Sequence, residues 1–398
     1  MNRKSFEIGM TGLLHALLHI YWFSLSPMYL LIQEEFHVST LQLGLIGSML
    51  GITTLLQGPV GYVVERFGRK RFTATSILIY SVAVFGFGMA PSVLVLLAFV
   101  FIAGLGASGF HPASYSLVAL KMAKKHLSKA IAYHTLGGFV GGAIGTVLIA
   151  LSAVTFGWRL TLQTLAVVGI FIVCLFWIVV REEQSTAVHR RDRTPSPKTM
   201  RERAEFRFTT PLLIMFLVTF LSSFAYLSSF MPLFLSKGFS KTVASAGILT
   251  AVMQGAGCIA MVISGIIGDR LDKVYTVAVF SVATGILRVF LALGAQQTLP
   301  LELLVLLLCF QGFAQNFTNP TKHTLVAILS SGRPQGIGFE FTAMSLGSIL
   351  AAPLIGYVSD VFGIPFAFIT TSIFAFLSGI VVLFVKKTTT ARAHLSKE

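Results

Sequence analysis

Charged residues are scarce in this chain: only 11% of its 398 residues are Asp, Glu, Lys or Arg. Soluble globular proteins carry about a quarter of such residues, so this composition does not suit a water-facing surface. The charges are also bunched, and they leave uncharged runs such as 36–64 and 72–120. Each run exceeds the roughly 20 residues that a helix needs to cross a bilayer. The composition therefore excludes a soluble enzyme and a soluble nucleic-acid-binding protein, and it indicates an all-α membrane protein.

Cysteine is scarce too, and the common catalytic motifs are missing. The three cysteines, Cys174, Cys258 and Cys309, all lie in apolar runs. None belongs to a CxxC motif, which speaks against a disulfide framework and a cysteine metal site. The chain has no GxxxxGKS/T loop for ATP and no HExxH or GxSxG motif. We therefore expect no enzymatic activity, no cofactor and no bound metal.

Turn and charge signals divide the apolar runs into twelve predicted membrane spans. The Ala90-Pro91-Ser92 sequence separates the third span from the fourth, because proline removes a backbone donor and disfavours helix in the preceding residue. The predicted spans lie near residues 8–32, 41–63, 72–90, 92–118, 130–153, 160–180, 209–235, 242–267, 275–295, 299–328, 336–357 and 364–385.

A long polar segment follows the sixth span and contains Pro195 and Pro197. Its composition is typical of a flexible linker. We predict an N-terminal six-helix bundle over residues 1–180, a cytoplasmic linker over 181–208, and a C-terminal six-helix bundle with a cytoplasmic tail over 209–398.

The basic residues predict the orientation of these spans. The net charge is +15, and 25 of the 30 Lys and Arg residues lie on one side of the predicted topology. Only Arg159, Lys237 and Lys241 lie on the other side. Because basic residues mark cytoplasmic loops, we expect a multi-pass protein of the cell inner (plasma) membrane with both termini in the cytoplasm. The positive charge then faces anionic lipid, so we expect the bilayer as a partner and no nucleic acid.

The two predicted bundles repeat one another in sequence. The sequence GYVVER at 61–66 is echoed by GIIGDR at 265–270, and the run that begins at Pro112 is echoed by the run that begins at Pro320. The two offsets, 204 and 208 residues, are nearly equal. A duplicated set of six spans is typical of secondary transporters, whose substrate site lies near the membrane midplane between the repeats.

The loop after the second span reads GPVGYVVERFGRKR. It resembles the cytoplasmic loop signature of the major facilitator superfamily, G-x-x-x-D-R-x-G-R-K, with Glu65 where Asp is usual. The resemblance implies a charged network that latches the outward-facing state; alternatively, the arginines only enforce topology. The implied gating residues are Gly61, Glu65, Arg66, Gly68, Arg69, Lys70, Asp269 and Arg270.

Within that superfamily, two further patterns narrow the resemblance. The fourth span carries GLGASGFHPASYSLVA at 104–119, and the first span carries two histidines. Both patterns resemble the fosmidomycin-resistance-like exporters. Where those exporters have an acid one turn after the first-span histidine, this chain has His19. The resemblance implies a proton-coupled export carrier.

Histidines are prominent among the ionisable groups inside the spans, which are costly in hydrocarbon and usually face a cavity or a partner. His15 and His19 lie one turn apart on one face of the first span. They could line the cavity, exchange protons, bind a metal ion or only pack. Two histidines without a clustered third ligand are a weak metal signal. His111 precedes a proline in the fourth span, where it could contact substrate or only cap the break.

The tenth and eleventh spans carry Lys322, His323 and Glu340 at comparable predicted depth. An unpaired buried charge is expensive, so we predict a Lys322–Glu340 ion pair. Glu340 is also the first candidate for carrying a coupling proton, and a static pair is the alternative. The candidate residues for substrate or coupling ion are His15, His19, Trp22, His111, Gln311, Asn316, Lys322, His323 and Glu340.

The leading hypothesis is a monomeric secondary transporter that exports a small amphiphilic organic compound or drug in exchange for protons, by alternating access. One alternative is an uptake carrier for an organic anion such as a carboxylate, with Arg288 or Lys322 as counter-charge. A divalent-metal exporter that uses the histidines and a non-transporting receptor are further alternatives. A mainly aromatic cavity favours the exporter, a net positive cavity favours the anion carrier, and clustered histidine nitrogens favour a metal.

Overall fold

The computed structural model describes residues 3–122, 124–181, 209–224, 229–268, 270–295, 297, 299–330 and 334–387. Helices are the only repeating secondary structure in these ranges. The first half forms α1 (Arg3–Trp22), η1 (Ser26–Met28), α2 (Tyr29–Phe36), α3 (Thr40–Thr54), α4 (Gln57–Phe67), α5 (Arg69–Met89), α6 (Val93–Lys121), α7 (Lys124–Phe156) and α8 (Trp158–Val179). The second half forms α11 (Thr210–Phe224), α12 (Met231–Gly238), α13 (Val243–Ile267), α14 (Lys273–Gly294), α15 (Leu301–Leu329), α16 (Pro334–Phe362) and α17 (Ile364–Val381).

The helices have the length and composition of membrane spans. Ten of those described are long and apolar enough to cross a bilayer, and the second and seventh predicted spans correspond to the pairs α3–α4 and α11–α12. The prediction of an all-α membrane protein is therefore confirmed. The predicted linker lies, apart from Arg181, outside the described residues, so the boundaries of the two bundles stay predictions.

The prediction of one unbroken helix per span is wrong for three spans. The first span ends its helix at Trp22 and continues through the short 3₁₀ helix η1 before α2. Pro27 lies in η1 and has no backbone N–H, which explains why the α-helix does not run through this point. The seventh span restarts at α12 with a proline in its first turn, where a missing N–H costs nothing. The second span breaks between α3 and α4, where Leu55 donates to Ile52 in a tightened turn.

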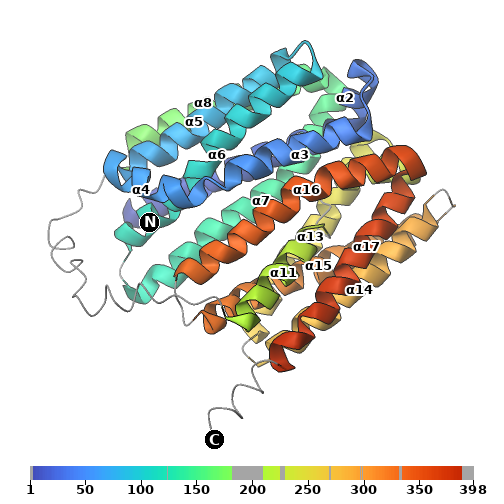
Figure 1. Cartoon of the computed structure of the whole chain (residues 1–398). Helices are drawn as coiled ribbons and strands as arrows, with labels where there is room; N and C mark the ends of the chain where they lie inside the picture. The colour runs from blue at the N-terminus through green and yellow to red at the C-terminus, as the bar shows by residue number, and fades with distance from the viewer. Residues whose placement is uncertain are drawn as a thin grey trace, which may run out of the picture.

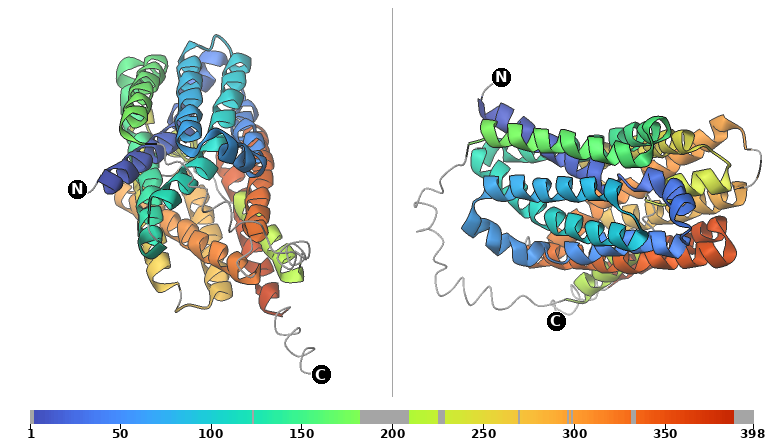
Figure 2. Two further views of the ribbon diagram at one scale, coloured as in Figure 1. Left: turned by 90° about the vertical axis from the view of Figure 1, so that its left-hand side faces the viewer. Right: turned by 90° about the horizontal axis from the view of Figure 1, so that it is seen from above.

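The two halves of the chain lie side by side, and most helices run along one common direction (Figure 1; Figure 2, right). Between the halves, α3 packs against α16 and α7 packs against α13. The start of α1 and the end of α17 lie at the same end of the molecule, which we call the terminal end, and the turn between α2 and α3 lies at the opposite end (Figure 1). The architecture therefore leaves a long interface between two helical halves.

Glycines on α7 bring α1 unusually close within the first half. A Cβ atom at Gly141 would lie 2.4 Å from the carbonyl oxygen of Ala16, and one at Gly137 would lie 2.5 Å from that of Gly12. Such small-residue seams let membrane helices approach through their backbones. The seam fixes the rotation of α1 against α7, and so it decides which side chains of the two helices meet.

Polar contacts join the two halves at the opposite end of the molecule and further along the interface between α3 and α16. Asp360 on α16 accepts hydrogen bonds from the backbone N–H groups of Thr40 and Leu41, both at 2.8 Å. Because these are free N–H groups at the start of α3, the carboxylate also meets the positive end of the helix dipole. Further along the interface, Ser48 donates to the carbonyl oxygen of Ile349 at 2.6 Å. The halves are therefore closed against each other at the opposite end.

Candidate functional site

A cavity of about 100 Å³ lies between the halves. Its aromatic wall includes Tyr21, Trp22 and Tyr29 from the first half and Phe230 from the second half. Its polar atoms come from tyrosine and serine side chains, such as Ser223. Among the described residues that line it there is no Lys, Arg, His, Asp or Glu. Of the residues predicted to bind substrate, only Trp22 belongs to this lining.

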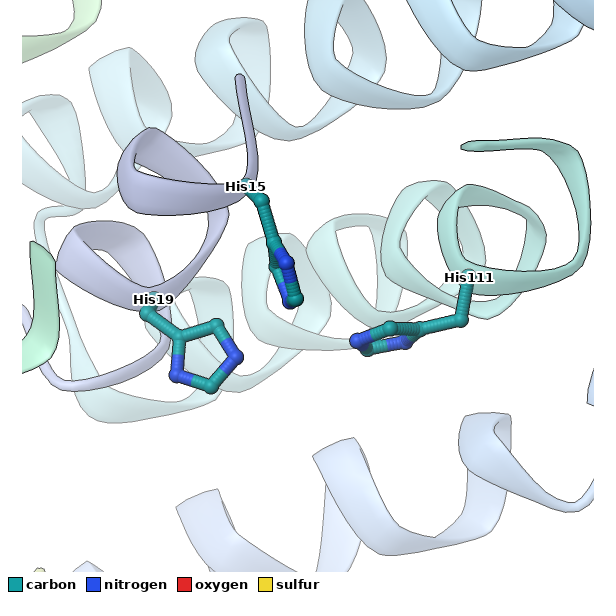
Figure 3. Close-up of side chains that lie close together, drawn as sticks. All are labelled: His15, His19 and His111. Atoms are coloured by element: carbon teal, nitrogen blue, oxygen red, sulfur yellow. The ribbon is translucent and has the colours of Figure 1, made fainter. Parts of the chain in front are cut away.

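A cluster of histidines lies within the first half, and α1, α6 and α7 build it. His15 and His19 from α1 and His111 from α6 each offer a ring nitrogen, and these three atoms lie within 4.8 Å of one another. Figure 3 shows the three rings turned toward a common space. His134 from α7 stacks on His15 with ring centroids 4.4 Å apart. The sequence suggested two clustered histidines, whereas the fold brings together four.

Hydrogen bonds determine the protonation pattern of His15. Its Nδ1 lies 2.8 Å from the carbonyl oxygen of His134. A carbonyl oxygen can only accept, so Nδ1 carries the hydrogen and the neutral ring keeps a free lone pair on Nε2. That Nε2 atom is fully buried and has no hydrogen-bond partner in the described structure. The Nε2 atom of His134 is itself paired with the hydroxyl of Ser114 at 3.2 Å.

The signal for His134 was available but weak in the sequence. His134 lies one turn before Gly138, where a Cβ atom would meet His15 Nε2 at 2.9 Å and His19 Cδ2 at 3.0 Å. A histidine one turn from a glycine seam can reach the neighbouring helix backbone. Which neighbour it reaches depends on the rotation of both helices, and the local sequence does not report that rotation.

The second half contains a buried arginine that has no acidic partner among the described residues. Arg288 on α14 is 0% exposed. Its Nη2 donates to Gln315 Oε1 at 2.6 Å, and its Nη1 donates to Thr371 Oγ1 at 3.1 Å. With the Gln311 amide turned over, Oε1 of Gln311 accepts from Arg288 Nε at 3.0 Å. All three acceptors are neutral, so within the part of the chain that the structure describes the guanidinium charge is hydrogen-bonded but has no counter-charge.

Glu340 contacts a different residue from the one that the sequence suggested. Glu340 Oε1 lies 3.0 Å from His323 Nδ1, whereas the predicted Lys322–Glu340 pair does not form a direct contact. Adjacent residues of a helix point about 100° apart, and it is His323 that faces Glu340. Glu340 is 4% exposed, and neither of its oxygens has a well-aligned hydrogen bond among the described residues. Lys322 is also buried.

The sequence pattern that describes the Major Facilitator Superfamily matches residues 11–301 and 274–398. The chain belongs to this superfamily. Relatives include the cis,cis-muconate transport protein of Acinetobacter baylyi, which is 26% identical over 89% of this chain and 88% of its own length. The fosmidomycin resistance protein of Escherichia coli is 24% identical over 69% of this chain and 68% of its own length.

Solved structures agree on the fold. A bacterial homologue of the human lysosomal transporter Spinster, in an inward-facing and occupied conformation, superposes with a TM-score of 0.83. The two chains are 15% identical, and the match covers 98% of each. Membership of the superfamily and this fold show that the protein is a multi-pass membrane transporter of the major facilitator type.

In this superfamily member, the predicted gating residues of the first half lie at the terminal end around α4 and α5, and Arg270 is exposed between α13 and α14. Gly68 ends α4 with a φ of 93°, a conformation that glycine adopts without strain. Arg66 is exposed, and Lys70 Nζ lies 5.2 Å from the ring centroid of Trp177. Gly61 belongs to α4, whereas the side chain of Glu65 and all of Asp269 lie outside the described part. The latch across the terminal end therefore remains a prediction.

Two predicted substrate residues serve the packing of the second half. Gln311 belongs to the arginine cluster described above. Asn316 donates to the carbonyl oxygen of Gly312 within α15, at 3.0 Å, and its side chain occupies the space that Gly257 leaves on α13. Asp360, which joins the halves, was not among the sequence candidates. In the sequence Asp360 is simply an acidic residue near a helix end. Its contact with the start of α3 depends on the packing of α16 against α3, which the sequence does not report.

Proposed function

We propose that this chain exports a small amphiphilic organic compound or drug in exchange for protons, by alternating access and without chemical change of the substrate. The observation that carries the proposal is the cavity between the halves, whose described lining is rich in aromatic residues and contains no charged side chain. Aromatic rings bury apolar ligand surface, and a few hydroxyl groups orient the ligand. The resemblance to a fosmidomycin resistance protein supports an exporter.

The orientation of the proposed carrier follows from its charges. Basic residues gather at the terminal end, around α4 and the start of α5. We therefore assign the terminal end to the cytoplasm and the opposite end to the outer side of the inner membrane. The contacts of Asp360 then close the outer side, and rocking of the halves about the central cavity would open it.

Transport in proteoliposomes tests the proposed function. Purified full-length protein is reconstituted and loaded with a fluorescent amphiphilic dye or unlabelled drugs, and a pH gradient of either sign is imposed. The proposal expects movement of the dye against its gradient when protons flow the other way. Movement that ignores the sign of the pH gradient, or no movement of any amphiphile in a broad panel, would overturn it.

Asp360 provides a test of alternating access. Asp360→Ala removes two hydrogen bonds to the start of α3, and because the site is partly exposed we expect a loss of about 1 kcal/mol, or roughly fivefold in the ratio of outward-closed to outward-open molecules. Spin labels on α3 and α16 at the opposite end would report the change as a larger population of long distances. The native cysteines are replaced by serine beforehand.

Asp272→Ala is the matched control for that experiment. Asp272 also caps a helix, but its Oδ1 accepts from Val274 and Tyr275 of its own helix α14. The N–H of Tyr275 is the main cause that lowers the pKa of Asp272 below its ordinary value. Asp272→Ala should weaken α14 locally and leave the distances between the halves unchanged. An equal change in both variants would contradict the gating role of Asp360.

A second candidate function is the transport of an organic anion, and the Arg288 cluster favours it. A buried guanidinium whose described acceptors are all neutral retains its affinity for a carboxylate, because Arg binds carboxylates through two parallel hydrogen bonds. The relative named for cis,cis-muconate, a dicarboxylate, is consistent with this candidate.

Arg288→Gln separates the two candidates. If Arg288 binds the anion, muconate should raise the melting temperature of the wild type and not that of Arg288→Gln, since a ligand stabilises only the form that binds it. Arg159→Gln is the control, because Arg159 already forms an ion pair with Glu35 at 2.7 Å. A muconate-induced shift that survives in Arg288→Gln rejects the anion site, and stabilisation by neutral amphiphiles alone favours the first proposal.

A further inference from the structure

The histidine cluster lies in the interior of the first half, and the central cavity does not include it. We propose that His15, His19 and His111 bind one divalent transition-metal ion such as Zn²⁺ or Ni²⁺. Neutral imidazole is the ligand that these metals share in proteins. Three protein nitrogens leave one coordination position for water. The residues that line the cavity include none of the three histidines, so the proposal is independent of the transported substrate.

His15 has the arrangement that histidine ligands usually have. A ligating ring typically donates its other N–H to a carbonyl or carboxylate group, which fixes the tautomer and the ring orientation. In His15 the Nδ1–H donates to the carbonyl oxygen of His134, and Nε2 is left with a lone pair. A buried polar atom without a partner is uncommon and calls for an explanation. A metal ion would satisfy the Nε2 atom, which is buried in the described structure.

The other two rings are free to complete the site. In the described structure the ring nitrogens of His19 and His111 form no hydrogen bond, although both side chains are partly buried. The ring of His15 meets those of His19 and His111 edge-on, with centroids 4.9 Å and 5.3 Å away. The rings therefore do not stack on one another, and one nitrogen atom of each ring lies within 4.8 Å of the other two.

The distances require only a small adjustment. Nitrogens bound tetrahedrally to Zn²⁺ at about 2.0–2.1 Å are roughly 3.3 Å apart, and the three candidate nitrogens lie within 4.8 Å of one another. Rotations of the His19 and His111 side chains can supply the difference, because no described hydrogen bond holds them. Gly138 supplies the room on α7, since a Cβ atom there would touch His15 and His19.

Zn²⁺ binding to the tag-free, full-length protein in nanodiscs tests the proposal. Competition against a chromophoric chelator should give one tight ion per wild-type chain. His19→Asn and His111→Asn should each weaken the affinity by about a hundredfold or more, because each removes one of three ligands. His15→Asn keeps an amide donor for the His134 carbonyl and loses the Nε2 atom, so it should weaken binding equally. Co²⁺ in place of Zn²⁺ should show visible absorption of tetrahedral nitrogen coordination in the wild type only.

Two further variants distinguish a specific metal site from disruption of the fold and from binding to dispersed histidines. Gly138→Ala keeps all three ligands but displaces two of them, and we expect about a tenfold loss of affinity. His37→Asn is the control: His37 is exposed and lies at φ 51°, a conformation that Asn tolerates. Unchanged stoichiometry and affinity in both His19→Asn and His111→Asn would overturn the proposal. So would an equal loss in His37→Asn, because it would show binding to dispersed histidines.

Discussion

Glu340→Gln is expected to abolish transport driven by a pH gradient, with a fall of at least about tenfold in initial rate, because the amide has no proton to exchange. Glu340 is a buried carboxylate between α15 and α16, and its neighbours are His323 at 3.0 Å and the buried cation Lys322. Protonation of Glu340 would change the charge balance of this group. Initial rates in proteoliposomes with an imposed pH gradient measure the effect.

The same variant should keep substrate exchange that no pH gradient drives. Gln has nearly the shape of Glu, so the helices need not repack. The matched control is Glu302→Gln, because Glu302 lies exposed in the first turn of the neighbouring helix, α15. If Glu340→Gln retains full proton-driven transport, Glu340 forms a static pair with His323 and the coupling proton travels elsewhere.

Trp22→Ala is expected to weaken substrate binding by about 2 kcal/mol, or roughly thirtyfold in Kd, as for a central aromatic residue of a binding surface. Trp22 is the largest side chain in the cavity wall, and alanine removes most of its apolar contact area. The concentration that gives half-maximal transport should rise, while the rate at saturation should change less. Dye titrations of the reconstituted protein measure both quantities.

Phe171→Ala is the control for Trp22→Ala. Phe171 on α8 is also aromatic, but it is 68% exposed on the outer surface of the helices, where lipid would cover it. Its removal should leave the half-maximal concentration unchanged. Equal effects of the two substitutions would show that the central cavity does not bind the substrate.

Much of the fold follows from local signals. The break at Pro91 does separate α5 from α6, because the missing N–H of proline acts on its own helix whatever the rest of the chain does. The small-residue spacing of Gly137 and Gly141 does mark the contact of α7 with α1. The interruption within the second span was not predicted, because Leu55 and Leu56 are as apolar as the helices on either side. Pro27 was a local signal for the interruption within the first span.

The candidate site was much less predictable than the fold. The proximity of His15 and His19 follows from helical spacing alone. Whether His111 and His134 lie beside them depends on how three helices are rotated against one another. Many of these helices are apolar on all sides, so the usual contrast between a buried and an exposed face is weak. For the same reason the sequence predicted correctly that Glu340 lies beside α15, but the predicted partner was Lys322, whereas the structure shows His323.

The sequence by itself determined that this protein is helical, spans a membrane many times and repeats a six-span unit. Those properties depend on the transfer of each residue from water to hydrocarbon, which adds up along the chain. Only the tertiary structure decided that Asp360 meets the start of α3, that the cavity wall is aromatic and uncharged, and that three histidines share one space. These meetings depend on the rotation and close approach of whole helices, which glycine seams and long-range hydrogen bonds set together.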